Sequence, residues 1–434
     1  MNAQLAALSL ACLSALAWAA PAGAEKTVRK SSGNAEKAED DETKEDLDEG
    51  TMTPHKAPPI EGLPVEEERT PLRETLQEQN DRPFDNAVYK GAELLGLPPE
   101  FVNDARTGLD LIYQRAYPKA MDHFGAMDGR WPGSAVGPVG RGLVFQALML
   151  ENFDFKYEKQ YQTNWADARS KVTQAIEVPG NDAWDYFLLV GVVGVEAIHA
   201  TRKYQYVEAL TKAYEALRAL EKCRELAPAF PDLSLADGIN NYWRSVVAMN
   251  TALIPDGPDR RAEGISQMAY AETNSVFVGA PATLALTFSY LEERDLKRAL
   301  GAATRSHQRY PHNVINNLVL ARIYVYMRRF PAAEEVLADE PDNERAHYYL
   351  SMIYSRTKRM DQAIAEMEKY LTFQLIPEYR GTALYRLAGY HYRKGEYAKA
   401  AALYQQAVDA DKHKGAKRRL EHMAKLRKEG KISY

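Results

Sequence analysis

The sequence predicts an all-α fold in which helix pairs stack into a solenoid. After Glu78, apolar residues recur at helical spacing almost to the end of the chain, and strand patterns are sparse. Four segments near the C-terminus repeat one arrangement of small and bulky residues, and internal repeats of this length are typical of stacked helical units. The apolar content of 45% in 434 residues is sufficient for a packed core.

In each of these four segments a small residue is followed three positions later by a ring. A bulky residue comes six positions after the ring, and an alanine three after that. Small residues let two helices approach closely, and the rings fill the space between successive units. The matches are Thr287, Tyr290, Leu296 and Ala299; Ala321, Tyr324, Phe330 and Ala333; Ser351, Tyr354, Met360 and Ala363; and Ala388, His391, Tyr397 and Ala400.

The alanines of successive segments lie 34, 30 and 37 residues apart, and Pro311 ends a predicted second helix. This pattern resembles the tetratricopeptide repeat, a helix–turn–helix unit of about 34 residues. The resemblance implies an α-solenoid, a right-handed superhelix in which the first helix of each repeat lines a concave groove. The stretch 232–312 is also similar to exported bacterial repeat proteins, and weakly to repeat proteins of the outer mitochondrial membrane.

The region before residue 276 shows a more divergent form of the same pattern. Its clearest match places Ala120 twelve residues before Pro132, and Ala216 and Pro228 repeat that spacing. Further helices are expected near 136–152, 160–177, 183–203, 232–252 and 259–273. We therefore divide the helical part into a divergent region (81–275), tetratricopeptide-type repeats (276–415) and a basic capping helix with its tail (416–434).

The first 24 residues have the pattern of a cleaved secretory signal. An apolar run from Leu5 to Ala20 is too short to span a bilayer, and Ala22 and Ala24 suit a signal peptidase. The sequence before Cys12 is a poor lipobox, so lipid anchoring there is not expected. The signal predicts export to the periplasm or cell envelope of a Gram-negative bacterium, and no other segment is expected to cross a membrane.

Residues 25–80 are expected to form a disordered acidic linker. Residues 25–78 hold 16 acidic and 8 basic side chains, whereas residues 79–434 carry a net charge of +3. Low hydrophobicity with high charge does not offset chain entropy. The linker is interpreted as a solvated spacer, with a tether or an acidic bait for a partner as the alternative.

The basic segment 412–431 is amphipathic, with Leu420, Met423, Ala424 and Leu426 on one side. A solenoid needs a terminal helix with a polar outer face, and this segment fits that role. Contact with an anionic membrane or a nucleic acid is the alternative. Because the sequence pI is near 6.1, no general nucleic-acid binding is expected.

No catalytic, cofactor-binding or metal-ligating residues are predicted. The chain lacks GxSxG, P-loop and HExxH motifs, and its nine histidines are scattered. The glycine-rich run 137–142 is interpreted as a structural turn rather than a phosphate cradle. Cys223 is expected in the core, and His199 is expected to be an ordinary helix residue.

The resemblance implies that groove-facing positions lie opposite the small-residue seam. Arginine forks hold carboxylates and tyrosines add rigid contact area, so we expect an extended or acidic peptide there, with merely hydrated inner-face residues as the alternative. The positions are Arg322, Tyr326, Tyr348, Arg356, Tyr385, Tyr392 and Arg393.

These features predict an exported interaction scaffold that binds a protein or peptide partner. The identity of the partner and the oligomeric state are left open. Two alternatives remain: an enzyme or enzyme subunit with a site in 136–275, or an envelope-associated assembly factor. Buried ionisable residues around one cleft would favour the enzyme.

Overall fold

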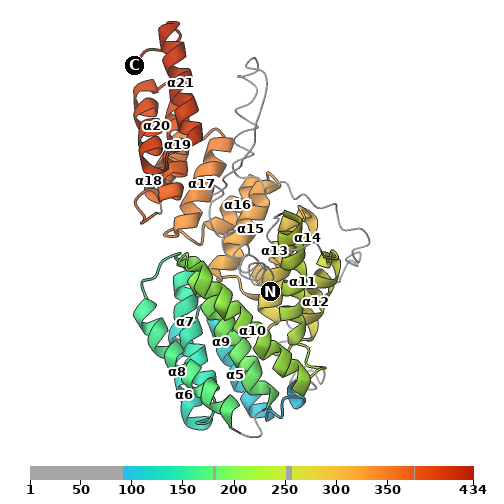
Figure 1. Ribbon diagram of the computed structural model, residues 1–434. Coiled ribbons are helices and arrows are strands. Elements are labelled where there is room, and N and C mark those ends of the chain that lie inside the picture. Colours follow the sequence, from blue (N-terminus) through green and yellow to red (C-terminus); the bar gives the residue numbers. More distant parts are fainter. Residues whose placement is uncertain (1–90, 179–181, 251–256, 376) are drawn as a thin grey trace. The chain divides into compact units, whose positions relative to one another are not determined.

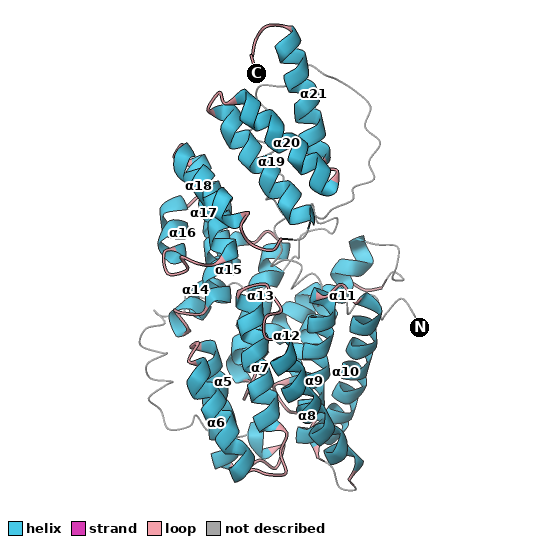
Figure 2. Ribbon diagram, turned by 90° about the vertical axis from the view of Figure 1, so that its left-hand side faces the viewer, coloured by secondary structure: helices cyan, strands magenta, loops and turns pink. Residues whose placement is uncertain are grey.

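A computed structural model describes residues 91–178, 182–250, 257–375 and 377–434. Within these ranges every regular element is a helix and successive helices pack in pairs, which confirms the all-α prediction (Figures 1 and 2). The described residues form two compact units, 91–317 and 318–434. The predicted signal and acidic linker lie outside the described residues.

The first unit contains the divergent region and the first of the four repeat segments. Helices occur close to all five stretches expected between 136 and 273. The predicted division at 275–276 falls inside this unit. Its helices are α5 (Pro99–Tyr113), α6 (Tyr117–Arg130), α7 (Val136–Glu151), α8 (Glu158–Glu177), α9 (Ala183–Arg202), α10 (Tyr206–Leu226), α11 (Leu233–Asn250), α12 (Arg261–Asn274), α13 (Gly279–Glu292), α14 (Leu296–Arg309) and the start of α15 (Val314–Tyr326).

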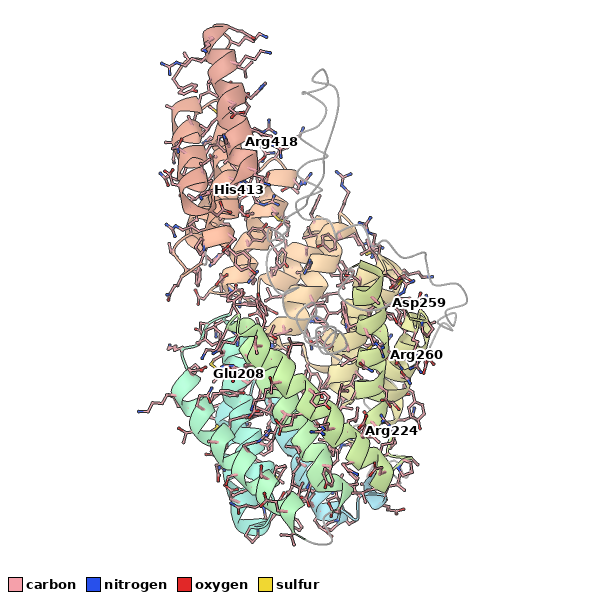
Figure 3. The ribbon with its side chains drawn as sticks, in the orientation of Figure 1. Glu208, Arg224, Asp259, Arg260, His413 and Arg418 are labelled. Carbon is pink, nitrogen blue, oxygen red and sulfur yellow. The ribbon has the colours of Figure 1, made fainter. Side chains whose placement is uncertain are left out.

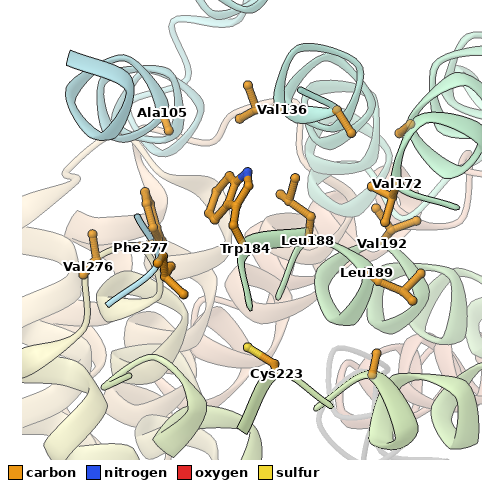
Figure 4. Close-up of a cluster of buried hydrophobic side chains, with 14 of the residues drawn as sticks. Ala105, Val136, Val172, Trp184, Leu188, Leu189, Val192, Cys223, Val276 and Phe277 are labelled. Atoms are coloured by element: carbon orange, nitrogen blue, oxygen red, sulfur yellow. The ribbon is translucent and has the colours of Figure 1, made fainter. Parts of the chain in front are cut away.

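Helix α9 supplies much of the core of the first unit. Trp184 and Leu188 are buried on it, and the Trp184 ring lies beside that of Phe277, with 5.3 Å between the ring centres (Figure 4). Cys223 of α10 is fully buried beside them, as expected, and its thiol donates to the Ala183 carbonyl at 3.3 Å. By length and composition α9 could cross a membrane, contrary to our expectation for this part of the chain. Half of its apolar stretch is buried in the unit, as in a core helix.

Glycines mark the places where helices of the first unit approach most closely. A Cβ at Gly140 would lie 2.1 Å from the Phe124 ring, and one at Gly142 would lie 2.3 Å from Trp165. The glycine-rich run 137–142 lies inside α7 and does not form the expected turn, because its glycines make room for neighbouring rings. At the α11–α12 crossing, a Cβ on Gly264 would lie 2.6 Å from the carbonyl oxygen of Gly238.

The second unit contains the other three repeat segments. Their small residues Ala321, Ala333, Ser351, Ala363 and Ala388 are all fully buried, as close helix packing requires. Helix α17 packs against α18, and α19 against α20. After the end of α15, the helices are α16 (Phe330–Leu337), α17 (Glu344–Arg356), α18 (Met360–Tyr370), α19 (Pro377–Arg393), α20 (Tyr397–Asp411) and α21 (Lys414–Lys428).

Helix α21 packs on α20 as the last helix of the second unit. Met423 is fully buried, and Leu420 and Leu426 are partly buried in the same cluster. Ala424 is exposed rather than part of the apolar side, and Ala416 is buried instead. The predicted apolar side was therefore one residue in error, because two helical turns place Ala416 and Met423, seven residues apart, on the same side.

Asp232 joins the α10–α11 turn to the start of α13. Its carboxylate accepts hydrogen bonds from the backbone N–H groups of Val276 and Phe277, both at 2.7 Å, and of Val278 at 3.1 Å. These N–H groups precede α13, where a helix leaves donors without internal partners. Burial raises the pKa of Asp232 to about 6, although the three hydrogen bonds oppose the shift.

The raised pKa of Asp232 predicts a specific pH dependence of stability. Between an unfolded pKa near 4 and the folded value of about 6, the folded state binds more protons. The stability contribution of Asp232 is therefore complete below pH 4 and is lost as pH rises through 6, by about 3 kcal/mol. The Asp232→Asn variant cannot titrate, so the difference in unfolding free energy between it and the wild type should change by that amount. A difference that is constant from pH 4 to 7 would contradict the assignment.

Candidate partner-binding face

Helices α15, α17 and α19 carry a connected series of arginine and tyrosine side chains. The series begins on α15, where Arg322 Nε donates to the Tyr326 hydroxyl at 2.9 Å and the guanidinium lies over the Tyr326 ring. Arg322 is only 8% exposed. Burial raises the pKa of Tyr326, so its hydroxyl stays protonated near neutral pH.

The series continues from α17 to α19 through Tyr348. Arg386 Nε donates to the Tyr348 hydroxyl at 3.0 Å, and its guanidinium lies 5.6 Å from the centre of that ring. Ser351 donates to the Tyr390 hydroxyl at 3.1 Å. These bonds connect the first helices of neighbouring repeats and hold the aromatic rings in place.

The exposed end of the series is at the last turn of α19. Arg393 lies over the Tyr390 ring at 5.3 Å and donates to Ser355 at 2.7 Å. Arg356 occupies the equivalent repeat position on α17 and is half-buried. We name this series the Arg–Tyr face and define it by Arg322, Tyr326, Tyr348, Arg386, Tyr390 and Arg393.

The structure does not bring all seven predicted residues together. Tyr385 stacks on His413 at 4.7 Å and contacts Tyr404 of α20 at 5.6 Å, so it fills the interface with the following helices. Tyr392 packs against Tyr397 at 5.3 Å, within its own helix pair. Both rings take part in packing between helices, away from the bonds that connect α17 and α19.

Sequence reasoning missed Arg386 and Tyr390. Arg386 lies two positions before the small residue Ala388 and Tyr390 lies two positions after it, whereas the predicted positions used the offsets −3, +1, +4 and +5. A residue three before the small position points toward the second helix of its own repeat, as the contact of Tyr348 with Tyr370 shows. The sequence does show an arginine two positions before the small residue. Its direction could be recognised only from the rotation of the helix about its axis, which the structure provides.

Ionisable side chains also cluster in the divergent region, between α8 and α9. His199 Nε2 lies 2.7 Å from Glu158 Oε2, and its Nδ1 lies 3.2 Å from Gln146 Oε1. The ring of Tyr161 stacks on the imidazole at 4.5 Å, and Phe155 packs on it edge-on. Burial lowers the pKa of His199, which Glu158 partly offsets.

This cluster has the contacts of a packed polar core. Arg202 Nη2 donates to the carbonyls of Met149 and Asp154, which ties α9 to the end of α7 and the following turn. His199, expected to be an ordinary helix residue, is buried and contacts both neighbouring helices. Across the described ranges, no group of three or more His, Cys, Asp and Glu side chains is arranged to hold a metal ion.

A family model described as the tetratricopeptide repeat matches residues 318–380 and 378–414. The chain therefore contains tetratricopeptide repeats. The match covers α15 to α20, which includes the whole Arg–Tyr face. The family prediction from the sequence is thereby confirmed, and its exported bacterial subtype stays a prediction. No curated protein matches this tetratricopeptide-repeat chain.

Solved structures similar to this tetratricopeptide-repeat protein include three proteins of low sequence identity. Human IFIT1, solved as a dimer with m7Gppp-AAAA, is 13% identical over 77% of this chain and 89% of its own, with a TM-score of 0.40. The P58(IPK) TPR domain is 15% identical over 80% and 99%, with a TM-score of 0.25. The C-terminal part of a TPR repeat-containing protein from Cytophaga hutchinsonii is 14% identical over 72% and 97%, with a TM-score of 0.24.

Proposed function

We propose that this protein is an interaction scaffold and that the Arg–Tyr face binds an extended or acidic peptide segment of a partner. The observation that supports the proposal is the set of arginine and tyrosine side chains on α15, α17 and α19, which hydrogen bonds join within α15 and between α17 and α19. Arginine forks pair with carboxylates, and rigid aromatic rings add contact area at little entropic cost. The tyrosine contacts hold the guanidinium groups in position before a ligand arrives.

Charge supports an acidic partner. Residues 318–434 contain 22 Lys and Arg against 15 Asp and Glu, a net charge of +7, whereas residues 91–317 have a net charge of −4. Such a field raises the association rate of an acidic segment and makes it sensitive to salt. The positive second unit is therefore the more favourable half for capturing acidic sequences.

The enzyme alternative receives less support from the contacts. The ionisable groups between α8 and α9 contact the rings of Tyr161, which is buried, and Phe155, which is exposed, and they bond to the surrounding helices. Tetratricopeptide repeats are binding modules in which catalysis is not the usual role, and function must be argued from a site. We also propose that the chain is exported, on the pattern of residues 1–24, which fractionation of an epitope-tagged chain would test.

The binding proposal is tested with charge reversal at Arg393, the exposed arginine of the Arg–Tyr face, and at Arg356, which occupies the equivalent repeat position on α17. Arg356→Glu with Arg393→Glu should lower partner capture at least about tenfold, because attraction becomes repulsion while the buried packing is kept. Crosslinking pull-down from the native envelope identifies the partner, and the Kd of the purified pair gives the magnitude. Arg322 is less suitable for reversal because a buried carboxylate there would destabilise the repeat.

The matched control reverses two exposed lysines on second helices, Lys369→Glu on α18 and Lys399→Glu on α20. It changes the net charge of the unit by the same amount at positions away from the Arg–Tyr face. The control should retain most of its capture. Equal capture by wild type and the arginine variant would exclude this face, and equal loss in both variants would indicate a general charge effect.

A further inference from the structure

The outer face of α21 is strongly basic, whereas a capping helix requires only a polar outer face. Its apolar side is buried against α20 through Ala416 and Met423, so only the polar side remains for a ligand. Lys414, Lys417, Arg418, Lys425 and Lys428 are all exposed on this side, and Figure 3 labels Arg418 there. Because the apolar side is already used, α21 cannot bind a membrane by burying it.

The cations on α21 outnumber its carboxylates. Several recur at three- and four-residue spacing, where like charges are mutually destabilising in a helix, although Glu421 has the same spacing to Lys417, Arg418 and Lys425, and Lys425 lies 4.0 Å from Glu429. Among the described residues, no carboxylate lies within 4.0 Å of Lys417, Arg418 or Lys428. We name Lys414, Lys417, Arg418, Lys425 and Lys428 the α21 basic face.

The helix dipole does not explain this charge. Lys425 and Lys428 lie near the C-terminal end of α21, where cations are favourable. Lys414 and Lys417 lie in the first turn, where the dipole disfavours positive charge and where no acidic residue is present. An external anion would relieve both the repulsion along the face and the unfavourable first turn.

We propose that residues 36–50 of this same chain bind the α21 basic face. That segment holds nine acidic and two basic residues, a net charge of −7, whereas α21 (Lys414–Lys428) holds seven basic residues and one acidic residue, a net charge of +6. The α21 basic face is separate from the Arg–Tyr face, two of whose three arginines are buried and bonded to tyrosines.

Covalent connection favours this segment over a free anion. Forty residues separate Gly50 from Gly91 and span at most about 130 Å when fully extended. A binding segment on a linker of this size acts at an effective concentration in the millimolar range, which a separate ligand would have to match. Docking would neutralise the α21 basic face and shield it from other polyanions.

The proposal is tested by energy transfer within the full chain. Dyes are attached at Ser32→Cys and Ser433→Cys in a chain carrying Cys12→Ser, because Cys223 is fully buried and does not label. Transfer should be high at low ionic strength and fall as salt screens the contact. Replacing four cations of the face with glutamine should lower the ratio of docked to undocked segment about tenfold, since each exposed ion pair contributes a factor of roughly two. The four are Lys417, Arg418, Lys425 and Lys428.

Two control variants isolate the contact. The α21 control replaces four exposed cations elsewhere in the second unit, Arg328, Lys358, Lys369 and Lys399, with glutamine and should keep the transfer. The segment variant replaces Asp40, Asp41, Asp46 and Asp48 with asparagine and should lose it. Its control replaces Glu61, Glu66, Glu67 and Glu68 with glutamine and should keep it.

Three results would overturn the proposal. The first is equal transfer in the α21 variant and its control. The second is transfer that rises with protein concentration, which would assign the contact to a second copy of the chain. The third uses phosphatidylglycerol vesicles as the probe: binding that depends on the four cations, with transfer unchanged, would assign the face to an anionic surface instead.

Discussion

Replacing Arg261 with methionine should destabilise the first unit by about 3–5 kcal/mol. Arg261 is fully buried, and its guanidinium donates to Asp259 Oδ2 at 2.7 Å and to Glu293 Oε2 at 2.8 Å. Tyr242, also fully buried, donates to Glu293 Oε1 at 2.8 Å. Methionine fills a similar volume but leaves the Glu293 carboxylate, only 9% exposed, without its cation.

The neighbouring arginine is a matched control. Arg260 forms a surface pair with Glu263 three residues along α12, and both side chains are nearly half exposed (Figure 3). Exposed pairs contribute little, so Arg260→Met should change the unfolding free energy by less than about 1 kcal/mol. Urea unfolding followed by hydrogen exchange of the first unit measures both variants. Similar losses in the two would show that the buried network does not lock α11, α12 and α13 together.

The Gly264→Ala substitution, which adds a single methyl group, should destabilise the α11–α12 pair by about 3 kcal/mol. Its Cβ would lie 2.6 Å from the Gly238 carbonyl oxygen and 2.7 Å from the Tyr242 backbone nitrogen. These are backbone atoms, so rotation of a side chain cannot relieve the contact, and the two helices must separate. Protection of the α11 and α12 amides from hydrogen exchange should fall in Gly264→Ala before that of the second unit.

The same glycine-to-alanine substitution should have the opposite effect on stability at Gly191. That glycine is exposed on α9, and no heavy atom lies within 4 Å of the position that an added Cβ would occupy. Alanine loses less backbone entropy than glycine in a helix, so Gly191→Ala should stabilise by roughly 0.5–1 kcal/mol. Thermal unfolding of both alanine variants gives the comparison. Destabilisation at both positions would mean that backbone approach is not what distinguishes Gly264.

Much of the fold could be predicted because helix packing leaves a local record in the sequence. A buried helix crossing needs small residues, and Ala321, Ser351 and Ala388 occupy such crossings at zero exposure. The divergent region was harder because its close contacts also use glycine against rings, as Gly142 against Trp165. Those contacts follow the same physical requirement but not the same residue pattern.

The candidate site was predicted less completely than the fold. Four residues of the Arg–Tyr face were placed by repeat position: Arg322, Tyr326, Tyr348 and Arg393. Arg386 was missed, and Tyr385 proved to be packed against His413 instead. Adjacent positions on a helix differ by about 100° in direction. An error of one position in the prediction therefore selects a side chain that packs between helices instead of one that faces a ligand.

The sequence by itself determined the helical class, the repeat family and the separation of an acidic segment from a basic C-terminal part. These properties depend on residue type and spacing. Both can be recognised in the sequence, because packing between neighbouring helices and local charge require particular residues at regular intervals. Only the tertiary structure decided which arginines are buried and bonded, because that depends on helix rotation. Arg261 and Arg260 show the reason: one is at the centre of a buried ionic network and the other in solvent, although they are neighbours in sequence.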